Sequence, residues 1–199
     1  MRRMRRERGF NLIELMIGIA IFAALMMMAI PTFTVFLANQ KIKNAAETTI
    51  AGINIARAEA VRRNAAVRFQ FVSDLTSACA LSTTSLAWVA SISDPTSACN
   101  SAPGATAAPQ IIQAKSASDG TDNIAMTVTG GSTLTFNGLG RVAGAGITQI
   151  MFASPTIGNC EHADASGTMR CMQISIGTSG SAKICDPKVT DATDPRVCN

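Results

Sequence analysis

The chain has 199 residues, of which 47% are hydrophobic and only 15% are charged, with six cysteines, one histidine and no tyrosine. This length suits one modest domain plus an apolar segment and argues against a multidomain enzyme, while the hydrophobicity argues against intrinsic disorder. Five of the 17 basic residues and one of the 13 acidic residues lie in the first nine positions, which leaves a neutral remainder with 12 of each. Because phosphate affinity rises with the number of cations presented, a strongly basic nucleic-acid binder is disfavoured.

An apolar run follows the basic patch and continues to about Ala38, with no polar residue from Leu15 to Ile30. As a helix, the roughly 24 residues from Leu15 to Ala38 would span about 36 Å, enough to cross a hydrocarbon core of about 30 Å. The run is too long for an ordinary secretory signal and lacks an Ala-x-Ala ending. The arginines ahead of it favour a cytoplasmic N-terminus, an asymmetry that Lys41 and Lys43 weaken, so everything after residue 40 is expected across the membrane.

Two residues in this segment are unusual for a membrane helix. A carboxylate such as that of Glu14 costs about 2.5–3.5 kcal/mol at a helix centre and less near a helix end. Glu14 is therefore either an interfacial acid that stays hydrated or a carboxylate that pairs with a cation from another chain. Pro31 removes a backbone donor, which would kink or locally melt the helix, although prolines are also tolerated in transmembrane helices.

The sequence Gly9-Phe10-Asn11-Leu12-Ile13-Glu14 resembles the prepilin signature of type IV pilins and type II secretion pseudopilins. The resemblance implies that a prepilin peptidase cuts between Gly9 and Phe10 and methylates the new Phe10 amine. It also implies that Glu14 pairs with the amino terminus of a neighbouring subunit when helices pack into a filament. Residues 1–9 would then be a cleaved leader, and residues 10–38 the transmembrane helix.

Residues 39–66 show the spacing of an amphipathic helix that continues the membrane span and covers a β-sheet. Its expected apolar stripe consists of Ile42, Ala46, Ile50, Ile53, Ala60 and Val61. Nearby basic residues could contact anionic lipid or nucleic acid, but a solvated helix face with local acid partners such as Glu59 is favoured. These basic residues are Arg57, Arg62, Arg63 and Arg68.

From residue 67 onward the pattern changes to the alternation of β-strands, beginning at Val67–Val72. Seven further strands are expected at residues 86–92, 110–114, 124–128, 133–136, 147–152, 169–176 and 182–185. Segments rich in Gly, Ser and Ala are expected as exposed loops, namely residues 93–109, 115–121 and 153–168. No internal repeat is evident. The predicted fold is α+β, with the long N-terminal helix packed on an antiparallel β domain at residues 67–199.

Three further motifs narrow the resemblance to GspH/FimT-type minor pilins and pseudopilins. Residues 56–64 (ARAEAVRRN) are similar to that family's helix-to-strand junction, and residues 136–142 (FNGLGRV) to its mid-domain strand and turn. Ile174-Ser175-Ile176 with Gly180 through Cys185 resembles its closing hairpin. The architecture implied is two antiparallel sheets packed against the helix.

All six cysteines lie beyond the membrane segment, so the predicted topology places them in an oxidising periplasm as disulfides. Nearest-neighbour pairing is favoured, because each bond would close a loop between strand edges: Cys79 with Cys99, Cys160 with Cys171, and Cys185 with Cys198. Cys160-Glu161-His162 offers too few ligands for a metal site, and no cofactor is predicted. His162, the one histidine, has no nucleophile motif beside it and no phosphate loop is present, so no enzyme activity is predicted.

The expected function is that of a minor pilin, a subunit that joins a priming or tip complex of a type IV pilus. Its expected partners are other pilin subunits, the prepilin peptidase and the inner membrane. A type II secretion pseudopilin is the nearer alternative because leader, helix and Glu14 are common to both machines, although the loop from Cys185 to Cys198 resembles pilus subunits.

A DNA-binding minor pilin is a further alternative, but nucleic acid is not an expected partner. Residues 179–183 (SGSAK) stand where a Gly-Arg-x-Arg motif would be expected in such a protein. In addition, acids are interspersed among the basic residues near the C-terminus, which are Arg170, Lys183, Lys188 and Arg196.

Overall fold

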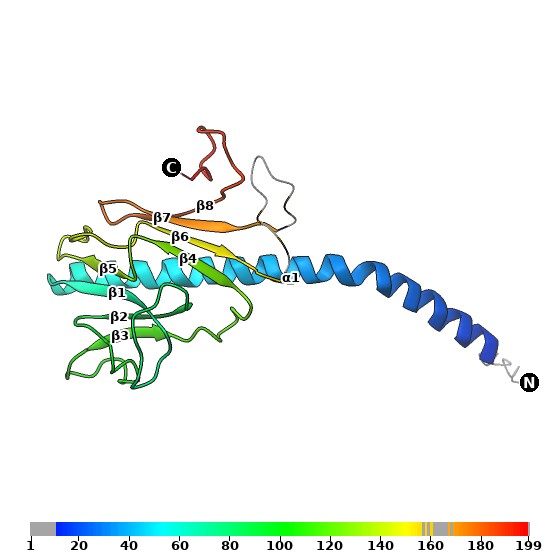
Figure 1. The fold of residues 1–199 in the computed structure, drawn as a ribbon, viewed down its shortest axis with the longest axis horizontal. Helices are drawn as coiled ribbons and strands as arrows, with labels where there is room; N and C mark the ends of the chain where they lie inside the picture. The colour runs from blue at the N-terminus through cyan, green and yellow to red at the C-terminus, as the bar shows by residue number, and fades with distance from the viewer. Residues whose placement is uncertain (1–10, 157, 159, 161–166, 168, 199) are drawn as a thin grey trace, which may run out of the picture.

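One long helix, α1 (Leu12–Arg63), runs the length of the protein in the computed structural model and projects from a β domain at its N-terminal end (Figure 1). The structure describes residues 11–156, 158, 160, 167 and 169–198, without the side chains of residues 28, 29 and 31. With 52 residues, α1 is about 78 Å long. It ends at Asn64, which adopts the left-handed conformation and donates its backbone N–H to the carbonyls of Ala60 and Val61.

The helix is bent by 45° between its parts Leu12–Met27 and Thr32–Arg63. The bend lies in the interval that holds Pro31, where the sequence predicts a kink. Divided at this bend, neither part of α1 is by itself long and apolar enough to cross a membrane, and no other described helix is. The two parts together are long and apolar enough to do so.

The β domain contains two antiparallel four-stranded sheets among the described residues. Its strands are β1 (Val67–Val72), β2 (Ala87–Ser91), β3 (Ile111–Lys115), β4 (Ala125–Thr129), β5 (Thr133–Phe136), β6 (Gln149–Ala153), β7 (Met172–Ile176) and β8 (Ala182–Cys185). The first sheet has the order β3-β2-β1-β5 and the second the order β4-β6-β7-β8. The predicted α+β class and the two-sheet architecture are therefore confirmed, and each expected strand is present with ends shifted by at most three residues.

The C-terminal part of α1 lies between the two sheets and packs on both (Figure 1). Because side chains three or four positions apart share a helix face, its buried side chains form one stripe: Ile42, Ala45, Ala46, Thr49, Ile53, Ala56 and Ala60. Val61 was predicted in this stripe but is 53% exposed. In the last turn of the helix, Val61 instead faces an open surface groove, which it lines with Arg57 and Leu139.

Aromatic side chains of the first sheet pack against the helix at Gly52. Phe69 and Phe71 project from the same face of β1 and contact edge to face, with ring centroids 5.1 Å apart. Phe69 also lies 5.4 Å from Trp88 of β2. The rings of Phe69 and Trp88 pack against the backbone of Gly52, where an added β-carbon would lie 2.7 Å from Trp88. Glycine at position 52 therefore allows this approach.

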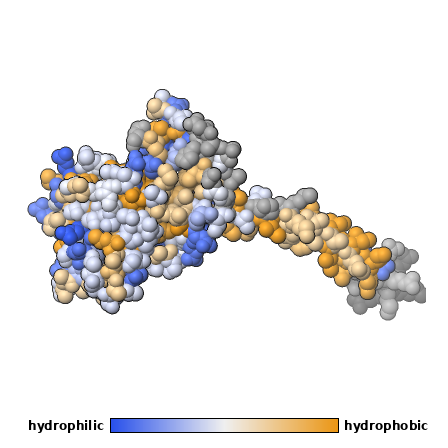
Figure 2. Space-filling model, in the orientation of Figure 1, coloured by the Kyte–Doolittle hydropathy of each residue, from blue (hydrophilic) through white to orange (hydrophobic). Residues whose placement is uncertain are grey.

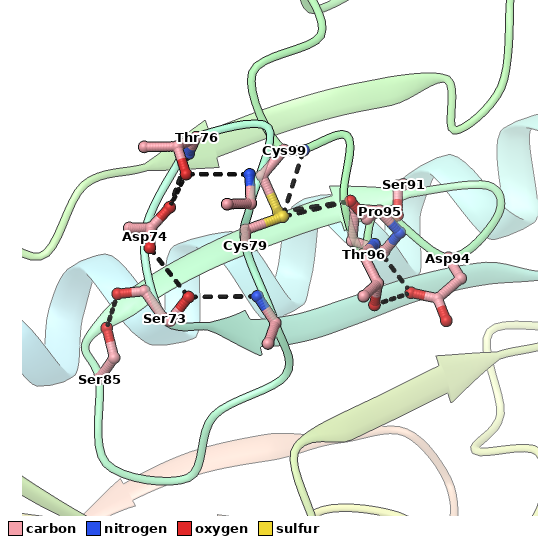
Figure 3. Close-up of a disulfide and its surroundings, with 12 residues drawn as sticks. Ser73, Asp74, Thr76, Cys79, Ser85, Ser91, Asp94, Pro95, Thr96 and Cys99 are labelled. Carbon is pink, nitrogen blue, oxygen red and sulfur yellow. Dashed lines mark hydrogen bonds between the residues drawn. A yellow bond between two sulfur atoms is a disulfide. The ribbon is translucent and has the colours of Figure 1, made fainter.

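The outer face of the first sheet is covered by its own connecting loops, so β2 is buried on both sides. Residues 73–86 and 92–110 fold across it, and the disulfide between Cys79 and Cys99 joins them (Figure 3). A second apolar cluster forms beneath them from Val72, Cys79, Ala87, Val89, Cys99 and Ile111. The expectation of a wholly exposed loop at residues 93–109 is wrong for Cys99, which lies in this cluster.

These two loops contain a short internal repeat, which corrects the expectation that there is none. Residues 73–79 read SDLTSAC and residues 93–99 read SDPTSAC. In each copy the aspartate accepts hydrogen bonds from the backbone and hydroxyl of the threonine two positions on, at 2.8 and 2.6 Å for Asp74 and at 3.0 and 2.7 Å for Asp94 (Figure 3). The same local turn thus presents each cysteine to the other.

Replacing Cys79 and Cys99 together with serine should lower the free energy of unfolding by about 3 kcal/mol, the chain-entropy value for a loop of this length. The loss comes from a less constrained unfolded state, and the second apolar cluster also loses its covalent clamp. Thermal unfolding of the non-reduced full chain, compared with the double serine variant, measures the effect. An unchanged midpoint would show that packing alone holds the two loops.

The other two disulfides join Cys160 to Cys171 and Cys185 to Cys198, which completes the nearest-neighbour pairing. β7 starts three residues later than predicted, and Met169 forms an isolated parallel bridge with Cys160 instead of belonging to the strand. The disulfide between Cys185 and Cys198 holds the C-terminal tail against β8. Lys183 reinforces it by donating a hydrogen bond of 3.1 Å to the carbonyl of Val197.

Candidate assembly surface and helix-to-sheet junction

The N-terminal part of α1 presents an apolar surface on all sides. Every residue from Leu12 to Met27 is exposed, and Glu14 is the one ionisable residue among them. Figure 2 shows this segment extending from the more hydrophilic β domain, and we call Leu12–Met27 the apolar rod. Contiguous apolar surface of this extent indicates a membrane or protein contact rather than a free surface in water.

Glu14 lies in the first turn of this rod, beyond the N-cap residue Asn11. It lines a shallow surface pocket with Leu15, Gly18, Ile19 and Phe22. Within the part of the chain that the structure describes, its carboxylate has no cationic partner within 4 Å. The predicted cleavage site at Gly9 and Phe10 lies outside the described residues. The carboxylate is thus presented on an apolar surface without a charge from its own described chain to neutralise it.

The three family motifs identified in the sequence meet at the C-terminal end of α1. A β-carbon on Gly138 would lie 2.6 Å from the side chain of Asn64, so the turn of residues 136–142 packs directly on the helix end. Gly140 has a φ of +72°, and its carbonyl accepts a 3.0 Å hydrogen bond from Arg57. A β-carbon on Gly180, in the β7–β8 hairpin, would meet the same carbonyl. This junction fixes the direction of α1 relative to both sheets.

The four arginines predicted as a basic cluster are separated in the structure. Arg62 and Arg63 both bind Glu59 at 2.7 Å, as the expectation of local acid partners proposes. Arg57 turns to Gly140 instead. Arg68 lies on β1, where its charge adds to the hydrogen bonds of Thr96 in lowering the pKa of Asp94. These four arginines therefore do not form a continuous basic face in the described part of the chain.

Acid should weaken the end of α1, because hydrogen bonds from Arg62 and Arg63 lower the pKa of Glu59 to about 2. A folded-state pKa below the unfolded value means that the carboxylate stabilises the fold above its ordinary pKa of 4.5, and that this contribution is lost as pH falls toward about 2. Thermal midpoints measured across this window should fall more for the unaltered chain than for Glu59→Gln. Parallel curves for the two proteins would contradict the assignment.

The basic residues considered for DNA contact near the C-terminus are largely engaged within the domain. Arg170 binds the buried carboxylate of Asp186 at 2.8 Å, and Arg196 binds Asp194 at 2.8 Å. The considered metal ligands Glu161 and His162 lie outside the described residues. Elsewhere in the described chain, no group of three or more His, Cys, Asp or Glu side chains is placed to hold a metal ion.

A polar cavity of about 260 Å³ lies where α1 enters the β domain, and sequence reasoning did not identify it. Lys41 and Asp122 line it together although they are 81 positions apart. Neither residue belongs to a recognisable motif, so the sequence contains no signal for this arrangement. It arises only when the loop before β4 folds against the helix.

Comparisons with known proteins identify the family. The profile described as "Type II transport protein GspH" matches residues 45–180, and the one described as "Prokaryotic N-terminal methylation motif" matches residues 4–30. No curated protein matches the chain. Solved structures similar to it include two crystal forms of the type IV minor pilin FimU from Pseudomonas aeruginosa. In space group P65 the match has 19% identity, covers 71% of this chain and 90% of that one, and has a TM-score of 0.44. In space group P21 the corresponding values are 20%, 75%, 91% and 0.45.

The GspH match covers more than half of the chain and contains both the helix end and the turn that packs on it. The methylation-motif match covers residues 4–30 and so contains the whole apolar rod, Leu12–Met27, with Glu14. On these two matches, the chain belongs to the GspH family and has a prokaryotic N-terminal methylation motif.

Proposed function

We propose that this protein is a minor pilin of a type IV pilus, anchored in the inner membrane by α1 and inserted through α1 into a filament. The observation that carries the proposal is the exposed apolar rod of Leu12–Met27 with one carboxylate, Glu14, in its first turn. A buried charge is tolerable only beside a compensating charge. A filament of parallel helices supplies that charge when the Phe10 amine of one subunit meets Glu14 of the next.

Processing precedes assembly in this proposal. The prepilin peptidase removes residues 1–9 and methylates Phe10, which creates the amine that Glu14 requires. The β domain, residues 67–199, lies in the periplasm, where its disulfides are stable. The chain's role is structural, and its partners are other pilin subunits that pack along α1.

A type II secretion pseudopilin is the second candidate, because the matching profile describes a type II transport protein. The leader, helix and carboxylate serve both machines equally. We do not propose DNA capture, because Arg170 and Arg196 are held by Asp186 and Asp194.

Mass spectrometry of the chain recovered from sheared surface filaments tests the proposal. The expected N-terminus is N-methylated Phe10, and retention of residues 1–9 in every assembled copy would overturn it. Deleting the gene distinguishes a subunit of a type IV pilus from a subunit of a type II secretion system. Loss of surface filaments with normal protein secretion supports the minor pilin, whereas the reverse pattern supports the pseudopilin.

A further inference from the structure

The polar cavity at the entry of α1 into the β domain is lined by two residues of opposite charge, Lys41 and Asp122, whose charged groups form no ion pair with each other. Lys41 directs its ammonium to the backbone carbonyl of Asp122, at 3.4 Å, and not to a carboxylate. The Asp122 carboxylate has no ion pair among the described residues. Ser154 and Thr156 add hydroxyl groups to the lining. The cavity therefore offers a cation, an anion and hydrogen-bonding groups to a ligand with both charges.

An apolar groove of about 790 Å³ adjoins this cavity along the helix. It lies beside the bend of α1 and is lined by Met26, Ile30, Thr32, Phe33, Thr34 and Phe36. Thr34 also lines the polar cavity, so the two spaces adjoin at this residue. Side by side along the helix, they place a cavity lined by charged and polar side chains next to an apolar groove.

The order of these two ends matches that of a lipid bilayer. Among the side chains of α1 that the structure describes, Ala38 is the first that is buried. The β domain therefore begins to cover the helix there, and the apolar groove lies on the side toward the N-terminus. In a helix anchored by residues 10–38, the groove lies at the depth of the acyl chains and Lys41 at the level of the headgroups.

We propose that this site binds one phospholipid with a phosphoethanolamine headgroup, its phosphate beside Lys41, its ammonium beside Asp122, and an acyl chain in the apolar groove. The inference rests on the membrane anchoring of the proposed function. An ammonium group has three donors, and Lys41 uses one on Asp122, which leaves donors for phosphate oxygens. The primary ammonium of the lipid donates charge-assisted hydrogen bonds to the Asp122 carboxylate. A choline headgroup has no N–H group to donate, and a glycerol headgroup donates only from neutral hydroxyls.

Native mass spectrometry of the full chain, released from nanodiscs of equal parts phosphatidylethanolamine, phosphatidylcholine and phosphatidylglycerol, tests the proposal. The expected result is one retained phosphatidylethanolamine per chain. Lys41→Gln and Asp122→Asn should each reduce its retention about tenfold, the size expected for one charge-assisted hydrogen bond. Lys43→Gln and Asp119→Asn are matched controls and should retain it, since Lys43 is exposed and paired with Glu47.

Three outcomes would overturn the lipid site. If phosphatidylglycerol were retained as well as phosphatidylethanolamine, the binding would be general charge attraction and not recognition of the headgroup. If Lys41→Gln and Asp122→Asn retained as much lipid as the unaltered chain, these two side chains would not bind it. A lipid-free dimer would show that a second copy occupies the groove. Carbonate extraction of cell membranes that contain the full chain separates this inference from the proposed function. An embedded chain that holds no lipid overturns only the site, whereas a chain that is not embedded contradicts the proposed function.

Discussion

Replacing Glu14 with alanine is expected to leave the chain inserted in the membrane and to remove it from sheared filaments. The substitution deletes the carboxylate but leaves the neighbouring subunit's amine, which then enters an apolar contact without a partner. Breaking a buried ion pair in this way costs about 3–5 kcal/mol. A cost of that size corresponds to a loss of incorporation of more than about a hundredfold. Quantitative immunoblots of membrane and sheared fractions measure both quantities in one experiment.

Glu47→Ala provides the matched control on the same helix. Glu47 is an exposed carboxylate paired with Lys43 at 3.7 Å, beyond the apolar rod. An exposed pair of this kind contributes little stability. We therefore expect its removal to leave incorporation unchanged. If Glu14→Ala reaches filaments at the level of Glu47→Ala, pairing between Glu14 and an amine is wrong.

Replacing Gly52 with valine is expected to destabilise the β domain by about 3 kcal/mol, at the upper end of the usual cost of overpacking a core. A β-carbon at this position would lie 2.7 Å from Trp88 and 2.9 Å from Phe69. Both rings are buried within the main core and cannot move aside without disturbing it. Glycine normally costs a helix about 1 kcal/mol relative to alanine, so a gain in helix propensity works against this penalty without cancelling it.

Thermal unfolding of the full chain in detergent measures this effect. A loss of 3 kcal/mol in a chain of this size corresponds to a midpoint lower by roughly 6–12 °C. Ala51→Val is the control, because Ala51 is exposed on the adjacent helix position and the same side chain meets no sheet there. Equal midpoints for the two variants would show that the helix and sheet separate easily at Gly52.

The local elements are predictable from sequence because their signals are local. Alternation in Val67–Val72 indicates a strand, and the helical stripe from Ile42 to Ala60 indicates which side is buried. The assignment of strands to sheets has no such signal. Thr133–Phe136 pairs with β1, whereas its sequence neighbours β4 and β6 pair with each other in the other sheet. These pairings depend on contacts between distant segments, which periodicity does not record.

The same limit applies to the candidate sites. Glu14 stands out because one acid interrupts an apolar run, and the glycines of residues 136–142 stand out as part of a family motif. Gly52 and Lys41 do not, because their significance depends on Trp88 and Asp122, which the fold brings to them from other elements. The buried outer face of the first sheet was missed for a related reason. Its cover consists of loops whose composition is typical of exposed segments.

The placement of the disulfides has a mechanical consequence for a filament under tension. All three lie within the β domain and close separations of 20, 11 and 13 residues, and no cysteine lies on α1. A pulling force applied through the helix therefore reaches β1 through the peptide backbone of residues 64–66, and no disulfide joins the rest of the helix to either sheet. Tension is thus carried past the helix–sheet contacts by a backbone link of three residues, while the three disulfides limit how far the loops of the β domain can extend.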